Sequence, residues 1–396
     1  MEKLGIGVIG CGIISQIAHF PSIDVLPETE LIATCDVNEK RAEEVAKKWH
    51  AKGKWYKDYR EMLEKEKLEV VIIATPQCFH REQSIAAIET GAHVFVEKPL
   101  ACTNKEAWEI VAAANKARVK LMVGCNQRFW PQHQIGKELI EQKVIGEVKM
   151  GRSSLHESWK LFPEKLAFTD FRRRANEGAS AALLEVAVHR IDLIRWLMGS
   201  EVKRVVGIAK RIASPESYTL LDDAMWMIME FENGSIAAVS SDRFSPAVSN
   251  ITEVYGTQGT LFLSSEATNP FQSVPLAIYT DRDYNWDELP EVMQKWFYPQ
   301  IFWPDDVITK PVPKRWISIS PPREWSYRRM IKYFIKCILE DREPELTSGK
   351  DGAKVIEIIC AVFKSMETNS WVDLPLKEEV VPPHYRAYYE KKKKMG

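Results

Sequence analysis

Glu97, Lys98 and Pro99 interrupt an apolar run in the segment HVFVEKPLA. Val94–Val96 is typical of a short buried strand, and the charged residues and the proline mark its end. Ligands of open α/β sheets bind outside the carboxyl ends of the strands. A single lysine is usually a surface residue, but at this strand end we interpret Lys98 as a functional lysine.

A second candidate site is the turn GVIGCGIIS, in which Gly10 and Gly12 fit the first two positions of G-x-G-x-x-G, while Ser15 takes the third. Gly10 would allow the tight turn, and Gly12 would let a pyrophosphate approach a helix N-terminus. Asp36, 24 residues after Gly12, ends the next apolar run, where an acid can bind a ribose 2′-hydroxyl. The alternative is a plain turn with Asp36 as a helix N-cap. The context favours dinucleotide binding, with NAD preferred over NADP.

Further polar residues follow the neighbouring predicted strands: Thr75 and Pro76, then His80, and on the next strand Asn126 and Arg128. Parallel strands bring such residues to one edge of a sheet. His80 fits a packing role and a cofactor contact equally well. Arg128 could equally tie two domains together.

The segment LLEVAVHRIDLIRWLMG predicts a helix that ends at Gly199. Glu185, His189 and Asp192 lie at i, i+4 and i+7, which places them on one face of an otherwise apolar helix. Buried carboxylates need partners or a polar ligand. From the spacing, an internal hydrogen-bonded network ranks first, acid–base catalysis by His189 second and a metal site third.

The composition is that of an ordinary globular protein: 396 residues, a net charge of −1 and 45% hydrophobic residues. This charge gives no reason to bind nucleic acid or a membrane surface. The seven cysteines form no C-x-x-C pair and favour reduced thiols in a cytoplasmic protein. The strand pattern starting at Leu4 leaves no room for a signal peptide, and no apolar run approaches a membrane span. The run KKKK at 391–394 is expected to be a solvated end.

The elements that must position these residues change character along the chain. Strands are predicted at Leu4–Ile9, Glu30–Cys35, Val70–Ala74, Val94–Val96 and Leu121–Gly124, alternating with helices at Ile13–Phe20, Glu39–Trp49, Arg81–Thr90 and Lys105–Ala117. This alternation predicts a parallel sheet with helices on both faces. After a helix at Gln132–Lys143, strands at Glu147–Leu155, Val202–Ile212, Ala224–Glu230, Ser235–Ser240, Ile251–Tyr255 and Thr260–Leu263 predict a separate, mostly antiparallel sheet.

These motifs together, with EVYGTQGTLFL at 253–263 and LTSGKDGAKVIEIICAVFKSMETNSWVDLPL at 346–376, resemble the glucose–fructose oxidoreductase / inositol dehydrogenase (Gfo/Idh/MocA) family. The resemblance implies an α/β protein with an N-terminal Rossmann doubly wound parallel sheet and a C-terminal α/β domain with a large, mostly antiparallel open sheet. It implies an NAD-binding domain at 1–125 and a substrate-binding and oligomerisation domain at 126–376, followed by a basic tail at 377–396. The open sheet would make a homo-oligomer, a dimer or tetramer.

The resemblance also implies roles for single residues. Lys98 would contact the nicotinamide ribose and the substrate hydroxyl, His189 would be catalytic, and Asp192 would bind substrate. Glu185, which stands where the family usually has Asp, would also bind substrate. Asn126 and Arg174 complete the expected substrate site, and no metal is expected. The expected cofactor contacts are Gly10, Gly12, Ile13, Ile14, Asp36, Arg41, Thr75, Pro76, His80, Glu97, Lys98 and Asn126.

Residues 264–324 depart from the family pattern and carry the aromatic residues Trp286, Trp296, Phe297, Tyr298, Phe302 and Trp303. Packing or an oligomer contact is favoured over an aromatic wall for a sugar ring. Arg172, Arg173 and Arg174 could line a pocket mouth for a carboxylate, but a solvated loop is favoured.

The resulting hypothesis is an NAD-dependent oxidoreductase that moves a hydride between a sugar or polyol hydroxyl and nicotinamide. One alternative is a redox-neutral NAD-dependent enzyme that acts on a glycoside or epimerises a sugar through a transient ketone. The other is a non-catalytic sensor of sugar or NAD.

Overall fold

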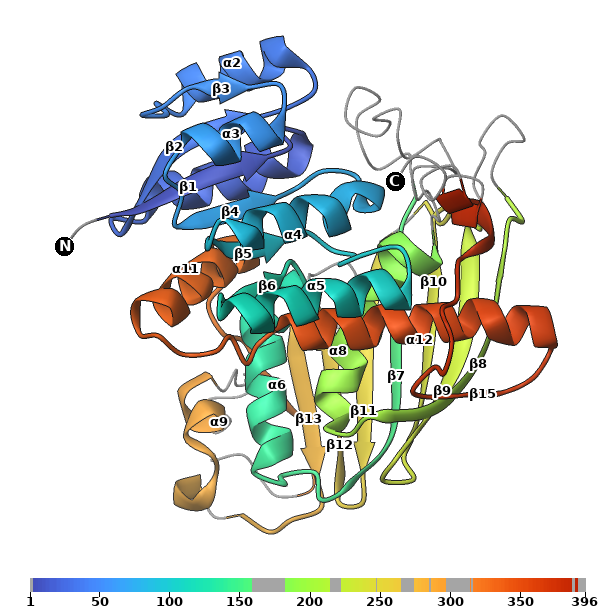
Figure 1. Cartoon of the computed structure of the whole chain (residues 1–396). Helices are drawn as coiled ribbons and strands as arrows, with labels where there is room; N and C mark the ends of the chain where they lie inside the picture. Colours follow the sequence, from blue (N-terminus) through green and yellow to red (C-terminus); the bar gives the residue numbers. More distant parts are fainter. Residues whose placement is uncertain are drawn as a thin grey trace.

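The chain folds around two sheets (Figure 1). The computed structural model describes residues 3–158, 182–213, 222–246, 248–264, 274–284, 286–296, 314, 316–386 and 389–390. Arg172, Arg173, Arg174, Phe297, Tyr298, Phe302, Trp303 and the run 391–394 lie outside these residues, as does the side chain of Trp286. Among the described residues, no helix combines the length and the hydropathy of a membrane span.

The first sheet has six parallel strands in the order β3-β2-β1-β4-β5-β6. They are β1 (Leu4–Ile9), β2 (Thr29–Cys35), β3 (Trp55–Tyr56), β4 (Val70–Ile73), β5 (His93–Val96) and β6 (Leu121–Val123). The connecting helices are α1 (Phe20–Val25), α2 (Glu39–Lys48), α3 (Tyr59–Lys65), α4 (His80–Glu89) and α5 (Asn104–Ala117). The predicted doubly wound parallel sheet is confirmed. The sequence missed β3 and α3, because a two-residue strand and a seven-residue helix leave little periodic signal.

The second sheet has nine strands in the order β14-β13-β12-β11-β7-β10-β9-β8-β15. They are β7 (Val148–His156), β8 (Val202–Lys210), β9 (Ala224–Phe231), β10 (Ile236–Asp242), β11 (Ser249–Gly256), β12 (Gly259–Ser264), β13 (Leu276–Thr280), β14 (Trp316–Ile319) and β15 (Val372–Asp373). Only β7 and β10 pair in parallel, so the predicted mostly antiparallel sheet is confirmed. Strands β13 and β14 lie in the segment expected to be atypical, where they extend this sheet at one edge.

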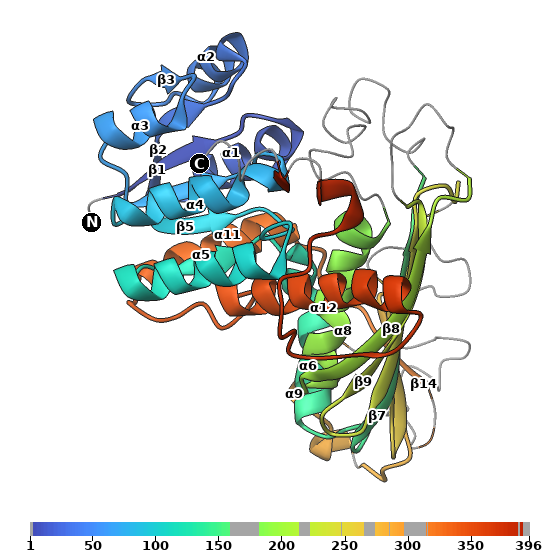
Figure 2. The ribbon, with the colours of Figure 1, turned by 45° about the vertical axis from the view of Figure 1, so that its right-hand side comes forward.

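Helices α6 (Pro131–Glu141), α8 (Val188–Met198) and α12 (Gly349–Thr368) pack on one face of the second sheet (Figure 2). The opposite face carries side chains from alternating strand positions. Exposed apolar residues on this face, which we call the outer face, are Met150, Ile208, Trp226, Ile228, Ile236 and Trp316. Trp296, at the end of α9 (Glu291–Trp296), is half-buried against the main core, as the packing interpretation predicted.

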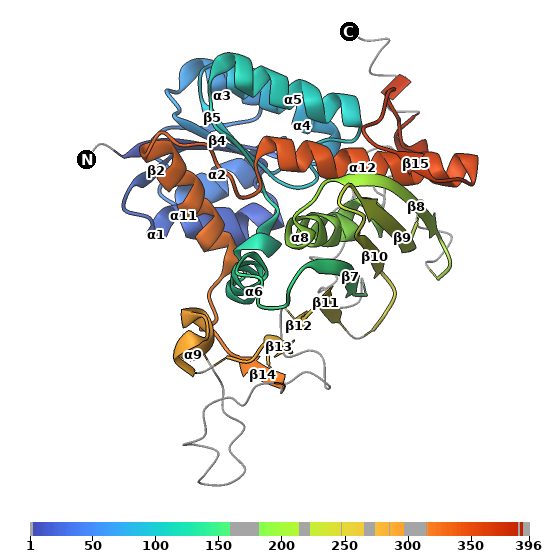
Figure 3. The same cartoon turned by 90° about the horizontal axis from the view of Figure 1, so that it is seen from below.

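The C-terminal part of the chain returns to the first sheet (Figure 3). Helix α11 (Ser326–Leu339) buries Phe334 against Phe95 of β5, and α12 packs between α5 and β8. Just before α12, the carbonyl of Thr347 accepts a hydrogen bond from the N–H of Val123 in β6, at 2.8 Å. Residues assigned to the second domain from the sequence therefore cover part of the first sheet.

The chain after β15 packs against α5 and against the loops that follow β4 and β5. Tyr385 is fully buried beside Cys78 and Cys102, and its hydroxyl donates to Glu106 at 3.2 Å. The side chain of Asn104 pairs with the backbone of residues 378 and 380. Residues 377–386 are thus docked on the first domain through Tyr385 and Asn104. The family motifs do not indicate this contact.

A buried ion pair joins the two sheets. Arg128 follows β6, and its Nε and Nη2 donate to the two carboxylate oxygens of Asp192 on α8, at 2.9 and 2.7 Å. Asp351, at the start of α12, accepts from Arg128 at 3.4 Å and from Arg195 at 2.7 Å. Arg128 is therefore the residue that ties the domains together, one of the two roles that the sequence left open.

Removing Asp192 should be strongly destabilising, because the buried guanidinium of Arg128 loses both of its short hydrogen bonds and keeps, of these two carboxylates, the more distant one of Asp351 at 3.4 Å. We expect Asp192→Asn to lower the free energy of unfolding by about 3–5 kcal/mol, measured by urea unfolding. The double variant Arg128→Met/Asp192→Leu should lose much less. Lys47→Met, which removes an exposed pair with Glu43, is the control and should leave the midpoint unchanged. Equal midpoints for Asp192→Asn and Lys47→Met would contradict the assignment.

Candidate active site

The carboxyl edge of the first sheet holds the glycine turn after β1. Gly10 has φ +95°, and a Cβ there would lie 2.6 Å from the carbonyl oxygen of Ala74, so the turn packs directly on the end of β4. A Cβ on Gly12 would meet no atom within 4 Å. The open space at Gly12, in front of the N–H groups of the following helix, fits a pyrophosphate.

Asp36 faces this turn from the end of β2. Its carboxylate accepts from the N–H groups of Cys11 at 2.9 Å and Asn38 at 2.8 Å, and Arg41 lies 3.5 Å away. The N-cap of α2 is Asn38, which accepts from the N–H of Arg41, so the alternative of Asp36 as an N-cap is wrong. Asp36 instead ties the glycine turn to β2, which positions an acid beside the open space at Gly12.

The helix after the glycine turn contains a π-helical turn at Ser15–His19, directly after Ile13 and Ile14. The imidazole of His19 is fully buried, and its Nε2 lies 2.9 Å from Oε1 of Glu97. The other oxygen of Glu97 accepts from the N–H of Lys98 at 3.2 Å. This chain of contacts links the glycine turn to Lys98. The sequence motifs did not single out His19, since no local pattern pairs it with a residue 78 positions away.

His80 is buried between two loops of the same edge. Its Nδ1 and Nε2 lie 2.8 Å from the carbonyl oxygens of Pro99 and Thr75, respectively. Burial lowers the pKa of His80. Thr75 also contacts Gln83 at 2.5 Å, and Pro76 begins a short 3₁₀ turn. His80 therefore holds the loop after β4 to the loop after Lys98.

Lys98 contacts the turn that precedes His189, between the two sheets. The Nζ of Lys98 donates to the carbonyl of Glu185 at 3.1 Å, in a π-helical turn at Leu183–Ala187 that leads into α8. Such turns are frequent at functional sites. Burial, and then the positive charges of Lys98, Arg190 and Arg243, hold the pKa of His189 well below its usual value. His189 is therefore neutral at neutral pH and can accept a proton.

The acidic residues near His189 are engaged elsewhere. Glu185 pairs with Arg243 at 3.2 Å, and Arg243 also binds Glu157. The fully buried Asp192 has both oxygens bound by Arg128. Nδ1 of His189 is buried and has no hydrogen-bond partner among the described residues. The hydrogen-bonded network ranked first from the spacing thus exists for Glu185 and Asp192, but through two arginines rather than through His189.

Asn126 brings a polar group from the end of β6. Its Nδ2 donates to Ser326 at 3.1 Å, whereas its buried Oδ1 has no partner in the described part of the chain. An orphan acceptor at this edge suits an amide or hydroxyl donor of a ligand. Arg174, the remaining expected substrate contact, lies outside the described residues. Within those residues, no cluster of three His, Cys, Asp or Glu side chains could hold a metal ion.

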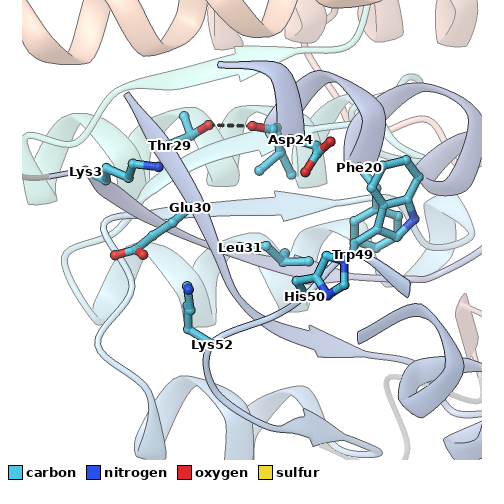
Figure 4. A pocket seen from close by; sticks show the side chains of 10 residues that line it. Lys3, Phe20, Asp24, Thr29, Glu30, Leu31, Trp49, His50 and Lys52 are labelled. Carbon is cyan, nitrogen blue, oxygen red and sulfur yellow. Dashed lines mark hydrogen bonds between the residues drawn. The ribbon is translucent and has the colours of Figure 1, made fainter. Parts of the chain in front are cut away.

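A surface cavity of about 160 Å³ lies elsewhere, at the amino ends of β1 and β2 (Figure 4). Lys3, Lys52, Phe20 and Trp49 are among its lining residues. None of the predicted site residues lines this cavity, so the chemistry described above belongs to the opposite edge of the first sheet.

Comparisons with known proteins agree with this arrangement. Residues 4–125 match a family model described as an oxidoreductase family with an NAD-binding Rossmann fold, and residues 133–262 match the model of the GFO/IDH/MocA C-terminal domain. Levoglucosan dehydrogenase of Pseudarthrobacter phenanthrenivorans is 27% identical over 411 residues, covering 95% of this chain and 99% of the relative. Myo-inositol 2-dehydrogenase of Thermotoga maritima is 26% identical over 378 residues, again covering 95% and 99%.

Solved structures share the fold. An oxidoreductase domain protein from Kribbella flavida superposes with a TM-score of 0.76 at 25% identity, covering 95% of this chain and all of that chain (100%). Levoglucosan dehydrogenase in complex with NADH and levoglucosan superposes with a TM-score of 0.76 at 24% identity, also covering 95% and 100%.

Proposed function

The chain belongs to the GFO/IDH/MocA oxidoreductase family, and we propose that it is an NAD-dependent dehydrogenase acting on a secondary hydroxyl of a sugar or polyol. The observation that carries this proposal is the meeting of Lys98 with the turn that leads to a neutral His189. In this proposal residues 1–125 bind the cofactor, residues 126–376 bind substrate and form the oligomer, and 377–396 is an appended segment. The relatives named for levoglucosan and inositol support the substrate class.

The residues present divide the chemistry between them. Nicotinamide, when bound, supplies the hydride acceptor. Lys98 donates a hydrogen bond to the substrate oxygen and stabilises the negative charge that develops there. His189 accepts the hydroxyl proton on its neutral imidazole. Glu97 and His19 position Lys98. Asn126 offers to cofactor or substrate its Oδ1, which has no partner among the described residues.

The alternatives receive less support from the site. A sensor has no need for a lysine and a neutral histidine at the meeting point of the two sheets, and both are present here. A redox-neutral enzyme would use the same residues but would return the hydride to its product. It differs from the proposed dehydrogenase in making no net NADH.

Lys98→Ala and His189→Ala should each lower kcat by about 10²–10⁴-fold while NAD still binds, because each removes a group that acts in proton transfer or charge stabilisation. The measurement is NAD reduction with a panel of sugars, inositols and sugar acids, beside an equilibrium titration with NAD. For the unmodified protein, kcat/KM should stay constant as the pH is lowered to 6.5, since His189 protonates only below its lowered pKa.

Full activity in either variant would overturn the assignment of that residue. Cofactor that copurifies with the protein, together with substrate turnover but no net NADH, would replace the dehydrogenase by the redox-neutral enzyme.

The proposed preference for NAD depends on Asp36, because its charge repels a 2′-phosphate while Arg41 beside it would attract one. Asp36→Asn keeps one acceptor oxygen and removes the charge. We expect it to shift the ratio of kcat/KM for NADP over NAD upward by about tenfold or more. Arg41→Ala is the matched variant and should shift the ratio the other way. An unchanged ratio in Asp36→Asn would contradict the role of Asp36.

The outer face of the second sheet is the proposed oligomer interface, because it exposes Trp226, Ile228 and other large apolar side chains. Light scattering should show a dimer or larger species for the unmodified protein and a smaller one for Trp226→Glu/Ile228→Glu. Leu339→Glu, at an exposed apolar position on α11, is the control and should leave the mass unchanged. A monomeric unmodified protein would rule out this interface.

A further inference from the structure

Arg190 differs from the other buried arginines near the site. Its side chain is fully buried, and its Nη1 donates to Oδ1 of Asn250 on β11. Its Nε and Nη2 have no hydrogen-bond partner among the described residues. Arg128, Arg195 and Arg243, in contrast, are each bound to carboxylates. The Nε–Nη2 edge of the Arg190 guanidinium, which we call the free edge, therefore has no partner in the part of the chain that the structure describes.

This arrangement is unfavourable for the folded protein by itself. A buried cation without a bound anion loses its hydration and gains little in return. Burial accordingly lowers the pKa of Arg190 to about 9, although Glu157 and Asp192 oppose the shift. A buried charge that its surroundings leave unpaired is typical of a site where a ligand completes the set of contacts.

The charge of Arg190 acts on the proposed catalytic group. Arg190 follows His189 on the first turn of α8, and its charge acts on the pKa of His189 and on that of His133 in α6. The charges that lower the pKa of His189, those of Lys98, Arg190 and Arg243, are all positive. Nearby buried atoms that also have no partner in the described structure are Oδ1 of Asn126, Oε1 of Gln127, Nε1 of Trp130 and Nδ1 of His189.

We propose that the free Nε–Nη2 edge of Arg190 binds a carboxylate of the substrate, so that the substrate is a sugar acid rather than a neutral sugar. This inference rests on the proposed dehydrogenase and names its substrate class. The Nε–Nη2 edge forms two parallel hydrogen bonds with a carboxylate, as Arg128 does with Asp192. Asn250 occupies the Nη1 end, so the ligand approaches the opposite edge. The excess positive charge around His189 favours an anionic ligand at the same place.

The first test uses the unmodified protein with matched pairs of substrates, namely glucose with glucuronate and galactose with galacturonate. Because charge-assisted hydrogen bonds in a buried site are strong, we expect kcat/KM for NAD reduction to be about ten- to hundredfold higher for the acid of at least one pair. Binding is measured separately, as the rise in melting temperature of the NAD-loaded protein with each of the four compounds.

The second test uses Arg190→Met, which keeps an unbranched, shorter side chain and removes the charge. We expect the preference for the acid to vanish through a higher KM, with turnover of neutral sugars retained. The melting temperature without ligand should stay level or rise, because an unpaired buried cation is removed. Arg190→Lys keeps the positive charge but lacks the paired N–H groups of the guanidinium, and it should restore part of the preference for the sugar acid. Arg195→Met on the same helix is the control: it should lower the melting temperature and leave the preference unchanged.

The outcomes separate this inference from the proposed function. Turnover of neutral sugars without any preference for acids, or a preference that survives Arg190→Met, would overturn the role of Arg190 and leave the dehydrogenase intact. No turnover of any compound by protein that binds NAD would overturn the dehydrogenase. In that case the melting temperatures still show whether Arg190 binds a carboxylate. If it does, a sugar acid stabilises the unmodified protein but not Arg190→Met. If Arg190→Met fails to fold, the preference for sugar acids is compared between Arg190→Lys and the unmodified protein instead.

Discussion

The ion pair between Arg128 and Asp192 sets the geometry on which the site depends. Two charges withdrawn from water are stable only when their geometry satisfies both, and here the guanidinium fork meets both carboxylate oxygens. Arg128 stands at the carboxyl end of β6, and Asp192 lies three residues after His189 on α8. The pair therefore fixes the first turn of α8 against the edge of the first sheet. Asp351 and Arg195 extend it to α12, so three elements share one charged junction.

Two π-helical turns lie on either side of the site. One π-helical turn follows the glycine turn, and the other precedes α8. Each turn shows a polar contact to the segment that carries Lys98: His19 contacts Glu97, and the carbonyl of Glu185 accepts from Lys98. The position of Lys98 is thus determined from both sheets at once. A lysine held in this way loses little further freedom when a ligand binds, which is the usual requirement for charge stabilisation in catalysis.

The polar groups around His189 are of two kinds. Arg243, Glu157, Glu185, Arg128 and Asp192 form ion pairs with one another within the protein. Asn126, His189 and Arg190 keep buried atoms without partners in the described structure. The ion-paired groups make the site rigid. The groups with unpartnered buried atoms would gain hydrogen bonds when a ligand binds. Burial, and then the positive charges of Lys98, Arg190 and Arg243, keep the pKa of His189 low. The carboxylates of Glu185 and Asp192 are bound by arginines.

The sequence by itself determined the local parts of this protein. Strand and helix periodicity predicted both sheets, and it placed Gly10, Gly12, Asp36 and Lys98 just after the ends of strands, where the structure has them. The spacing of Glu185, His189 and Asp192 correctly indicated a polar stripe on α8, and Gly199 ends that helix with φ +65°. These features depend on the local backbone geometry, which residues close together in the sequence determine.

Only the tertiary structure decided which charges meet. Arg243 and Glu185 lie 58 positions apart, His19 and Glu97 lie 78 apart, and no periodic pattern connects either pair. The packing of α11 and of Tyr385 on the first domain was equally absent from the motifs. Whether Arg190 is paired or free depends on every element packed around it, because a buried charge responds to its whole surroundings rather than to its neighbours in the chain.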